Sequence, residues 1–531
     1  MAEVVSTPPV LHAPSEKEKK YDRQLRLWAA TGQAALENAN ILLVNNTGPG
    51  TVGVEMLKNL VLPGIGRFTI ADEAVVGDAD LGVNFFLDES SRGKSRAQCC
   101  MELLNELNPD VQGDWFPKSQ EPFNLAGLLE FSSQFTIIIY ALPLPAETID
   151  LIHEYGRHHR IPAIAVHCVG FYAYFTVHLP GVFPIVDTHP DETATTDLRL
   201  LSPWPELSNF AEEMTENLGN LSHHDHGHVP MVALLLHFLE AWKREHQGKP
   251  PTAYADKVAF RKLVSDAMRT DNPEGGEENF EEAVAAVMKH IVQPPLSSSL
   301  KEVFEYEHDT EGPRSSFWVI ADAVKQFYAQ QGRLPVPGGL PDMKAQSDVY
   351  IKLQNIYKAQ ARRDAAEVLG LVRSSPGGAD IDAAEVELFC TNAKFIKLVN
   401  SAHRGKPDIQ KLVEQELGND VIAMAAGPEM PMSLIPIYLA LTATSHVASA
   451  TPQDIVASAC NRAPAAVGNT RVEQAAQEVA RAAGGELHNI AAVMGGMVAQ
   501  EVIKVVTQQY VPVDNTCIFD GIESRCQVLR L

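Results

Sequence analysis

The 531-residue sequence is poor in cysteine and in basic residues, and it has no long apolar run. Its seven cysteines form no Cys-x-x-Cys pair, which excludes a zinc site built from such pairs and is typical of reduced thiols. Lys and Arg number 43 against 67 Asp and Glu, and the net charge of −24 argues against a general nucleic-acid or anionic-membrane binder. No segment reaches the roughly 18 apolar residues of a membrane span, and residues 1–14 lack a signal-peptide pattern. We therefore expect an acidic, soluble, intracellular protein of about three folding units.

Short apolar runs alternate with helical patterns in the first third of the chain. The predicted strands are 41–44, 68–70, 135–139 and 163–166, and the predicted helices between them are 54–60, 95–107 and 146–158. Nearly continuous apolar strands that are separated by helices predict a parallel sheet covered on both faces.

The pattern changes near residue 180. Long helical periodicities separated by glycine and proline follow, and the last fifty residues return to a helix at 490–506 and strands at 516–519 and 527–529. These shifts predict an α/β fold with a flexible tail at 1–15, a first part at 16–180, a mostly α-helical insertion at 181–485 and a C-terminal part at 486–531.

The sharpest local motif is Gly48-Pro49-Gly50-Thr51-Val52-Gly53, which lies between a predicted strand and a predicted helix. Asp72 follows the next predicted strand about 20 residues further on, as in a Rossmann-type nucleotide site. Such glycines let backbone N–H groups approach a phosphate at the helix N-terminus, and the carboxylate can bind a ribose hydroxyl. A tight turn that only packs strand against helix is the alternative.

Further motifs surround this loop. They are Tyr21-Asp22-Arg23-Gln24-Leu25-Arg26-Leu27-Trp28, Asn84-Phe85-Phe86-Leu87, Gly93-Lys94-Ser95-Arg96-Ala97 and Ala499-Gln500-Glu501-Val502-Ile503-Lys504. Together they resemble the activating enzymes of ubiquitin-like proteins, which are built on the ThiF/MoeB adenylation fold. Two middle motifs, Pro203-Trp204-Pro205-Glu206-Leu207 and Tyr350-Ile351-Lys352-Leu353-Gln354-Asn355-Ile356-Tyr357, narrow the resemblance to the regulatory subunit of the neddylation activating enzyme.

Two groups that active members of the family supply are missing. The family's active-site Arg falls at Val83, and Tyr140-Ala141-Leu142-Pro143 offers no carboxylate where those members hold a metal. The resemblance therefore implies a pseudo-active adenylation domain at 16–180 and 486–531, with an insertion that lacks a catalytic cysteine. On this reading the chain is not an enzyme on its own, and ATP and Mg²⁺ are bound by the partner. The resemblance leaves open residual nucleotide binding at a vestigial site comprising Gly48, Gly50, Gly53, Asp72 and Lys94.

The resemblance also assigns roles to residues outside the glycine loop. It implies that Arg23 is an arginine finger that reaches the partner's ATP in trans, whereas by itself the residue is a solvated surface cation. The histidines between His223 and His228 invite a metal interpretation, but consecutive ligands on a short loop close a tetrahedron poorly, so we expect no metal. The expected contacts with the catalytic subunit are His228, Asp342, Met343, Tyr350, Leu353 and Asn355.

The expected partners are that catalytic subunit, a ubiquitin-like modifier and, transiently, a conjugating enzyme, with no nucleic acid and no membrane. The family implies residence in cytoplasm and nucleus. Cys168, Cys390, Cys517 and Cys526 are interpreted as buried structural thiols, and Cys460 as one that could be exposed but has no activating neighbour. The alternatives are the smaller subunit of the sumoylation activating enzyme, a self-sufficient adenylating enzyme, and an NAD-dependent oxidoreductase suggested by the glycine motif alone.

Overall fold

The computed structural model describes residues 13–118, 122–131, 135–191, 196–270, 275–292, 296–307, 314–399, 407–427 and 430–531. Most of the predicted tail at 1–15 therefore lies outside the described residues. The chain divides into two compact units. Unit 1 comprises Met1–Ile185 and Leu398–Leu531, and unit 2 comprises Val186–Lys397.

Unit 1 is built on an eight-stranded mixed sheet in the order β10-β9-β6-β5-β4-β1-β2-β3. Its parallel part contains β1 (Asn40–Val44), β2 (Arg67–Ala71), β3 (Gln112–Phe116), β4 (Ile137–Leu142) and β5 (Ala163–Val169). The remaining strands pair in antiparallel fashion and are β6 (Tyr172–His178), β9 (Thr516–Asp520) and β10 (Arg525–Leu529). The parallel α/β core predicted from the sequence is confirmed.

Successive residues of the central strands point to opposite faces of the sheet, because side chains alternate along a strand. Ile41 and Leu43 belong to one hydrophobic core and Leu42 and Val44 to the other. The first core is covered by α2 (Asp22–Glu37), α3 (Thr51–Val61), α5 (Arg96–Leu107) and α22 (His488–Thr507). The second is covered by α6 (Leu125–Phe131), α7 (Ala146–His159), α18 (Ile409–Ala426), α19 (Ile435–Thr442), α20 (Pro452–Arg462) and α21 (Thr470–Ala482).

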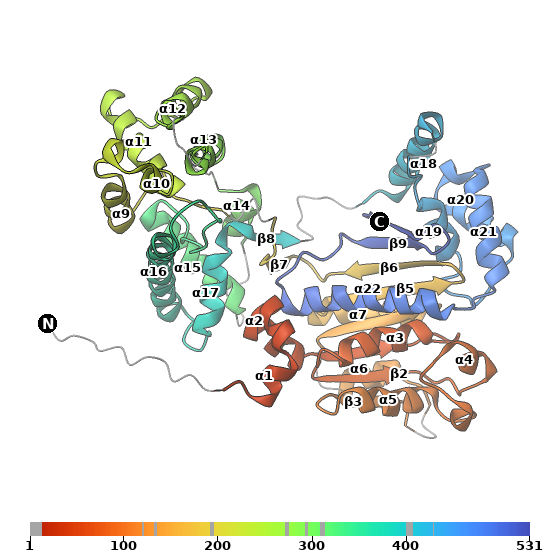
Figure 1. The fold of residues 1–531 in the computed structure, drawn as a ribbon. Coiled ribbons are helices and arrows are strands. Elements are labelled where there is room, and N and C mark those ends of the chain that lie inside the picture. Colours follow the sequence, from red (N-terminus) through yellow and green to blue (C-terminus); the bar gives the residue numbers. More distant parts are fainter. Residues whose placement is uncertain are drawn as a thin grey trace. The chain divides into compact units, whose positions relative to one another are not determined.

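The covering of the second face corrects one boundary of the sequence analysis. Residues 398–485, assigned there to the helical insertion, belong to unit 1, where α19 to α21 pack on the sheet (Figure 1). α21 is amphipathic and α19 is apolar on all sides. Either pattern shows that a helix is buried and does not show which partner buries it, so sequence pattern alone does not separate the two cases.

The helix α22 is, among the described residues, the one helix long and apolar enough to cross a membrane. It lies beside α3 in the first core (Figure 1), and 61% of its apolar window is buried. Gly495 allows this close approach, because a Cβ there would lie 2.8 Å from the backbone of Glu55. The composition of α22 is thus explained by its place in the core.

Unit 2 is mostly helical, as predicted. Its helices are α9 (Pro205–Thr215), α10 (His223–His226), α11 (Met231–Glu245), α12 (Tyr254–Asp266), α13 (Glu278–His290), α14 (Ser298–Glu305), α15 (Ser316–Gln331), α16 (Ser347–Ser374) and α17 (Ala383–Thr391). A core that includes Leu235, Phe280 and Tyr357 joins several of them. The chain passes between the units at β7 (Phe183–Val186) and β8 (Ile396–Val399), which form a two-stranded sheet.

Candidate functional site: a filled glycine loop

The glycine motif follows β1 at the carboxyl edge of the parallel strands and leads into α3. Gly50 precedes the helix in the left-handed region, with φ of 63°, and a Cβ there would lie 2.4 Å from Asn45 Nδ2. A Cβ at Gly53 would lie 2.8 Å from Asn45 Oδ1 and 3.0 Å from Leu43. Both glycines are therefore required by packing within the chain itself.

The side chain of Arg96 occupies the inside of this loop. It is 2% exposed, and its guanidinium donates to the carbonyl oxygens of Asn46, at 2.7 Å, and Gly48. It also pairs with both oxygens of Asp72, at 2.7 and 3.1 Å, and with Asp80 at 2.9 Å. Burial opposes the positive charge of Arg96, but the two carboxylates outweigh that effect and raise its pKa.

A carboxylate from the far end of the chain caps the amino end of α3. Glu486 Oε2 accepts a hydrogen bond from the Val52 N–H at 2.8 Å, and Oε1 accepts one from Asn46 Nδ2 at 2.9 Å. Glu486 is 4% exposed, and burial raises its pKa, whereas these hydrogen bonds and the charge of Arg96 favour the ionised form. The Glu486 carboxyl oxygens thus accept hydrogen bonds where a Rossmann-type fold binds phosphate.

The neighbouring edge of the sheet, after β4, is also covered from within the chain. The Leu144 N–H donates to Ser445 O at 3.0 Å, and the ring of His446 bonds Leu144 O at 3.1 Å. The buried ring of His167 bonds Thr444 at 2.9 Å. Residues 444–446 therefore cover the place where the family resemblance puts a metal-binding Asp.

The structure brings Gly48, Gly50, Gly53 and Asp72 together, as expected of a fingerprint. Lys94 is exposed, and within the described residues its side chain makes no hydrogen bond or ion pair with the loop. The cation at the loop is instead Arg96, two residues further on. Sequence reasoning missed the roles of Arg96 and Glu486. Arg96 stands inside the quoted motif, but its contact with Asp72 spans 24 residues, and Glu486 carries no local signal beyond the two glycines before it.

Arg23 lies near the start of α2 on an exposed part of the helix. The opposite side of the helix packs on the rest of unit 1. There Tyr21 and Trp28 are buried, and the Tyr21 hydroxyl accepts a hydrogen bond from Asn108 Nδ2 at 3.1 Å. Its neighbour Arg26 pairs with Asp22 at 3.0 Å. Among the described residues, by contrast, Arg23 makes no side-chain hydrogen bond or ion pair. Its guanidinium is therefore available to an external anion.

The expected contact residues for the catalytic subunit separate into two groups. Asp342 and Asn355 are exposed, and His228 and Tyr350 are half-buried. Met343, at 7% exposure, and Leu353, at 0%, belong to the hydrophobic core of unit 2. The expectation for Met343 and Leu353 is corrected, because side chains that fill their own core are not available to a partner's surface.

The histidine segment contributes one buried side chain, His226, to the interior of unit 2. His226 is buried, pairs with Glu277 at 2.6 Å and stacks on Phe280. His228 Nδ1 bonds the carbonyl oxygen of His224 at 2.7 Å. In the part of the chain that the structure describes, no three His, Cys, Asp or Glu side chains form a group that could hold a metal.

The cysteines fit the structural interpretation with one exception. Cys168, Cys390 and Cys517 are buried, and burial raises the pKa of each thiol, to about 12 for the last two. Cys526 is exposed, because it lies on β10, an edge strand, and its expected burial is corrected. Cys460 is half-buried.

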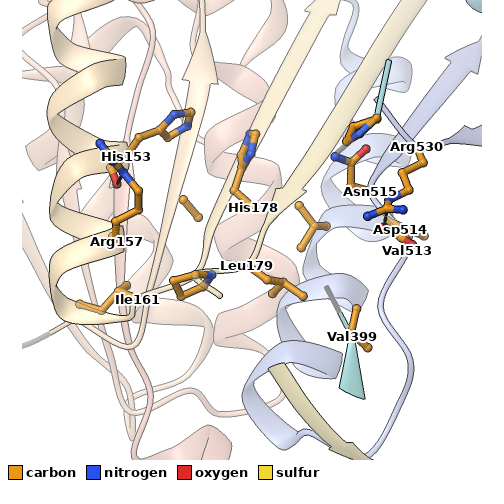
Figure 2. A pocket seen from close by; sticks show the side chains of 15 residues that line it. His153, Arg157, Ile161, His178, Leu179, Val399, Val513, Asp514, Asn515 and Arg530 are labelled. Carbon is orange, nitrogen blue, oxygen red and sulfur yellow. Dashed lines mark hydrogen bonds and ion pairs between the residues drawn. The ribbon is translucent and has the colours of Figure 1, made fainter. Parts of the chain in front are cut away.

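A separate cavity of about 300 Å³ lies in unit 1 at the start of β5 and the end of β6, the sheet edge opposite to the glycine loop (Figure 2). The rings of His153 and His178 are neighbours in the cavity wall, with centroids 4.7 Å apart, and the Tyr140 hydroxyl forms a hydrogen bond of 2.8 Å with His153. Burial lowers the pKa of His153 and lowers that of His178 to about 4. Both rings are therefore neutral near pH 7, and the cavity wall carries the charges of Arg157 and Arg530 beside Asp514.

Residues 21–531 match the ThiF family, which spans nearly the whole chain. The sheet order, the glycine loop after β1 and the match together define the class: a ThiF-type fold whose nucleotide loop is filled by its own Arg96 and Glu486.

Curated relatives define the branch. A NEDD8-activating enzyme E1 regulatory subunit of Xenopus laevis is 37% identical over 538 residues, covering 95% of this chain and 97% of the relative. Those of Drosophila melanogaster and Arabidopsis thaliana are 35% and 31% identical, each covering 97% of this chain and 98% and 97% of the relative. The chain belongs to the family of NEDD8-activating enzyme E1 regulatory subunits. The sumoylation and oxidoreductase alternatives are set aside, because these relatives align along nearly their full length.

Proposed function

We propose that this chain is the non-catalytic half of a heterodimeric activating enzyme for the cullin-attached ubiquitin-like modifier. In this proposal a separate catalytic subunit binds MgATP, forms the acyl-adenylate and carries the thioester. The observation that carries the proposal is the filled glycine loop in a chain of this family. The chain keeps the adenylation fold but places its own guanidinium and carboxylate where the nucleotide would lie.

The charges at the loop support the absence of a bound nucleotide. Asp72, Asp80 and Glu486 are buried beside one cation, Arg96, so a triphosphate would add negative charge to a desolvated site that is already net negative. Asp72, the group that would bind a ribose hydroxyl, has both oxygens engaged by Arg96. We therefore propose that ATP and Mg²⁺ are held by the partner alone.

In the same proposal, Arg23 completes the partner's ATP site from outside. The planar fork of a guanidinium matches two phosphate oxygens, so less freedom is lost for each hydrogen bond that it forms. The exposed position of Arg23 and the lack of an internal partner among the described residues support this role. Exposed residues of unit 2, such as Asp342 and Asn355, remain the proposed contacts with the catalytic subunit. The proposed residence in cytoplasm and nucleus rests on the family alone, and cell fractionation would test it.

ATP–pyrophosphate exchange driven by the modifier tests the proposal. We expect exchange from the mixture of this chain and its catalytic partner, and none from either alone. Arg23→Ala is expected to lower exchange on the order of 10³-fold, the scale of an arginine finger, while the heterodimer still forms. The matched control is Arg26→Ala, which removes an exposed arginine of the same helix that is already paired with Asp22. Exchange by this chain alone would overturn the non-catalytic assignment, and undiminished exchange with Arg23→Ala would overturn the finger.

A further inference from the structure

The amino end of α3 retains the features of an anion site. The first N–H groups of a helix have no partner within the helix and attract negative charge. Here no side chain of the preceding residues caps them, because the residue before the helix is Gly50. The cap is Glu486, which comes from 434 residues along the chain and is held at 2.8 Å by the Val52 N–H.

Two further polar atoms at this place are buried and have no hydrogen-bond partner among the residues that the structure describes. They are Thr51 Oγ1, on the first residue of α3, and Asn46 Oδ1, on the side chain whose amide holds Glu486. Thr51 is 1% exposed and Asn46 3%. A buried polar atom without a hydrogen bond costs free energy. The Thr51 hydroxyl is a donor that the carboxylate leaves unused, whereas Asn46 Oδ1 is an acceptor and needs a donor. The site offers more hydrogen-bonding capacity than its present occupant uses.

We propose that the amino end of α3 is still an anion-binding site, and that the carboxylate of Glu486 occupies it in place of a free anion. Shortening this side chain would then open a site for a small free anion. A small anion bound there would place its oxygens where the Glu486 carboxyl group now accepts from Asn46 Nδ2 and the Val52 N–H.

The ligand class of the opened site is a small anion without a nucleoside. A carboxylate or a phosphate can accept from Val52 N and Asn46 Nδ2 in the space that the Glu486 side chain leaves. The nucleoside side of the site stays closed, because Arg96 still engages Asp72 and the carbonyl oxygens of Asn46 and Gly48. ATP therefore gains nothing over inorganic phosphate in the opened site.

The test uses the full chain with Glu486→Ala, beside wild type and Glu486→Gln. The Gln variant keeps the size of the side chain and removes its charge. Calorimetric titration and thermal unfolding are measured with acetate, inorganic phosphate and MgATP. We expect Glu486→Ala to bind acetate or phosphate at least tenfold more tightly than wild type or Glu486→Gln, with a melting temperature that rises with anion concentration.

The two anion arms identify the preferred ligand. Tighter binding of acetate defines a monocarboxylate site, and tighter binding of phosphate defines a phosphate site. A folded Glu486→Ala variant that binds neither anion better than Glu486→Gln overturns the proposal, as does wild-type binding equal to that of the variant. If Glu486→Ala binds MgATP markedly more tightly than phosphate, the inference that the nucleoside side of the site is closed is wrong. If the Glu486→Ala chain folds only when acetate or phosphate is present, that rescue supports the proposal. If neither anion restores folding, the same titrations are made with Glu486→Ser, and their result decides the proposal. These measurements need no catalytic partner, so their outcome is separate from that of the exchange assay.

Discussion

Replacing Arg96 by leucine tests whether its guanidinium holds the glycine loop together. The change leaves Asp72 and Asp80 buried without their cation and removes the donors to two loop carbonyls. Removing one partner of a buried ion pair typically costs about 3–5 kcal/mol. Unfolding entropy is about 2.1 cal/mol/K per residue, so for a unit of roughly 300 residues this cost lowers the melting temperature by about 5–8 °C.

Differential scanning calorimetry of the single and double variants checks this reasoning. Arg96→Leu with Asp72→Asn should recover part of the lost stability, because the second change removes one of the unpaired charges. Arg96→Lys should fall between wild type and Arg96→Leu, because it keeps the charge and loses the planar fork. A melting temperature for Arg96→Leu within 1–2 °C of wild type, or a double variant less stable than the single one, would refute the pairing argument.

Three further predictions concern other parts of the chain. Gly50→Ala should destabilise unit 1 by at least about 2 kcal/mol, because its φ is positive and its Cβ would clash, while Gly48→Ala should cost less; equal losses in urea unfolding would contradict this. Met343→Asp should destabilise unit 2 by about 3 kcal/mol or more, whereas Asn355→Asp should leave its unfolding unchanged and act, if at all, on partner binding. Burial lowers the pKa of His178 in the folded chain to about 4. Between pH 6.5 and 4, His178 therefore binds a proton in the unfolded chain but not in the folded chain. Stability should therefore fall with pH in that window, by at most about 3 kcal/mol from this group, and His178→Gln should flatten the profile.

The sequence predicted the parts of the fold that depend on local pattern. The strands at 41–44 and 163–166 and the helices at 95–107 and 146–158 lie within a few residues of their observed bounds. Two strands of the eight-stranded sheet were missed, as were β7 and β8 of the two-stranded sheet. β3 (Gln112–Phe116) is an edge strand with glycine and aspartate and no continuous apolar run. β6 (Tyr172–His178) is rich in aromatic and β-branched residues, so its sequence favours a strand that the analysis overlooked.

The site was predicted only as far as its backbone. The glycines and Asp72 are close in sequence and fix the loop between strand and helix. What fills the loop depends on side chains that the fold brings together, across 24 residues for Arg96 and Asp72 and 434 residues for Glu486 and Val52. No periodicity or short motif encodes such a contact. The burial of Met343 and Leu353 was missed for a similar reason, since a motif shared with a family does not say which of its residues face inward.

The persistence of the glycine motif in a chain of this kind has a physical cause that does not require nucleotide. Gly50 is needed for its positive φ and its approach to Asn45, and Gly53 for the approach of α3 to β1. These are constraints of strand–helix packing, and they apply whether or not a phosphate binds. The family resemblance places Val83 and Ala141 at positions that would meet only the ligand, and such positions are not held by this packing. An intact glycine motif therefore indicates the fold, whereas the side chains that enter the loop indicate whether the site has room for a nucleotide.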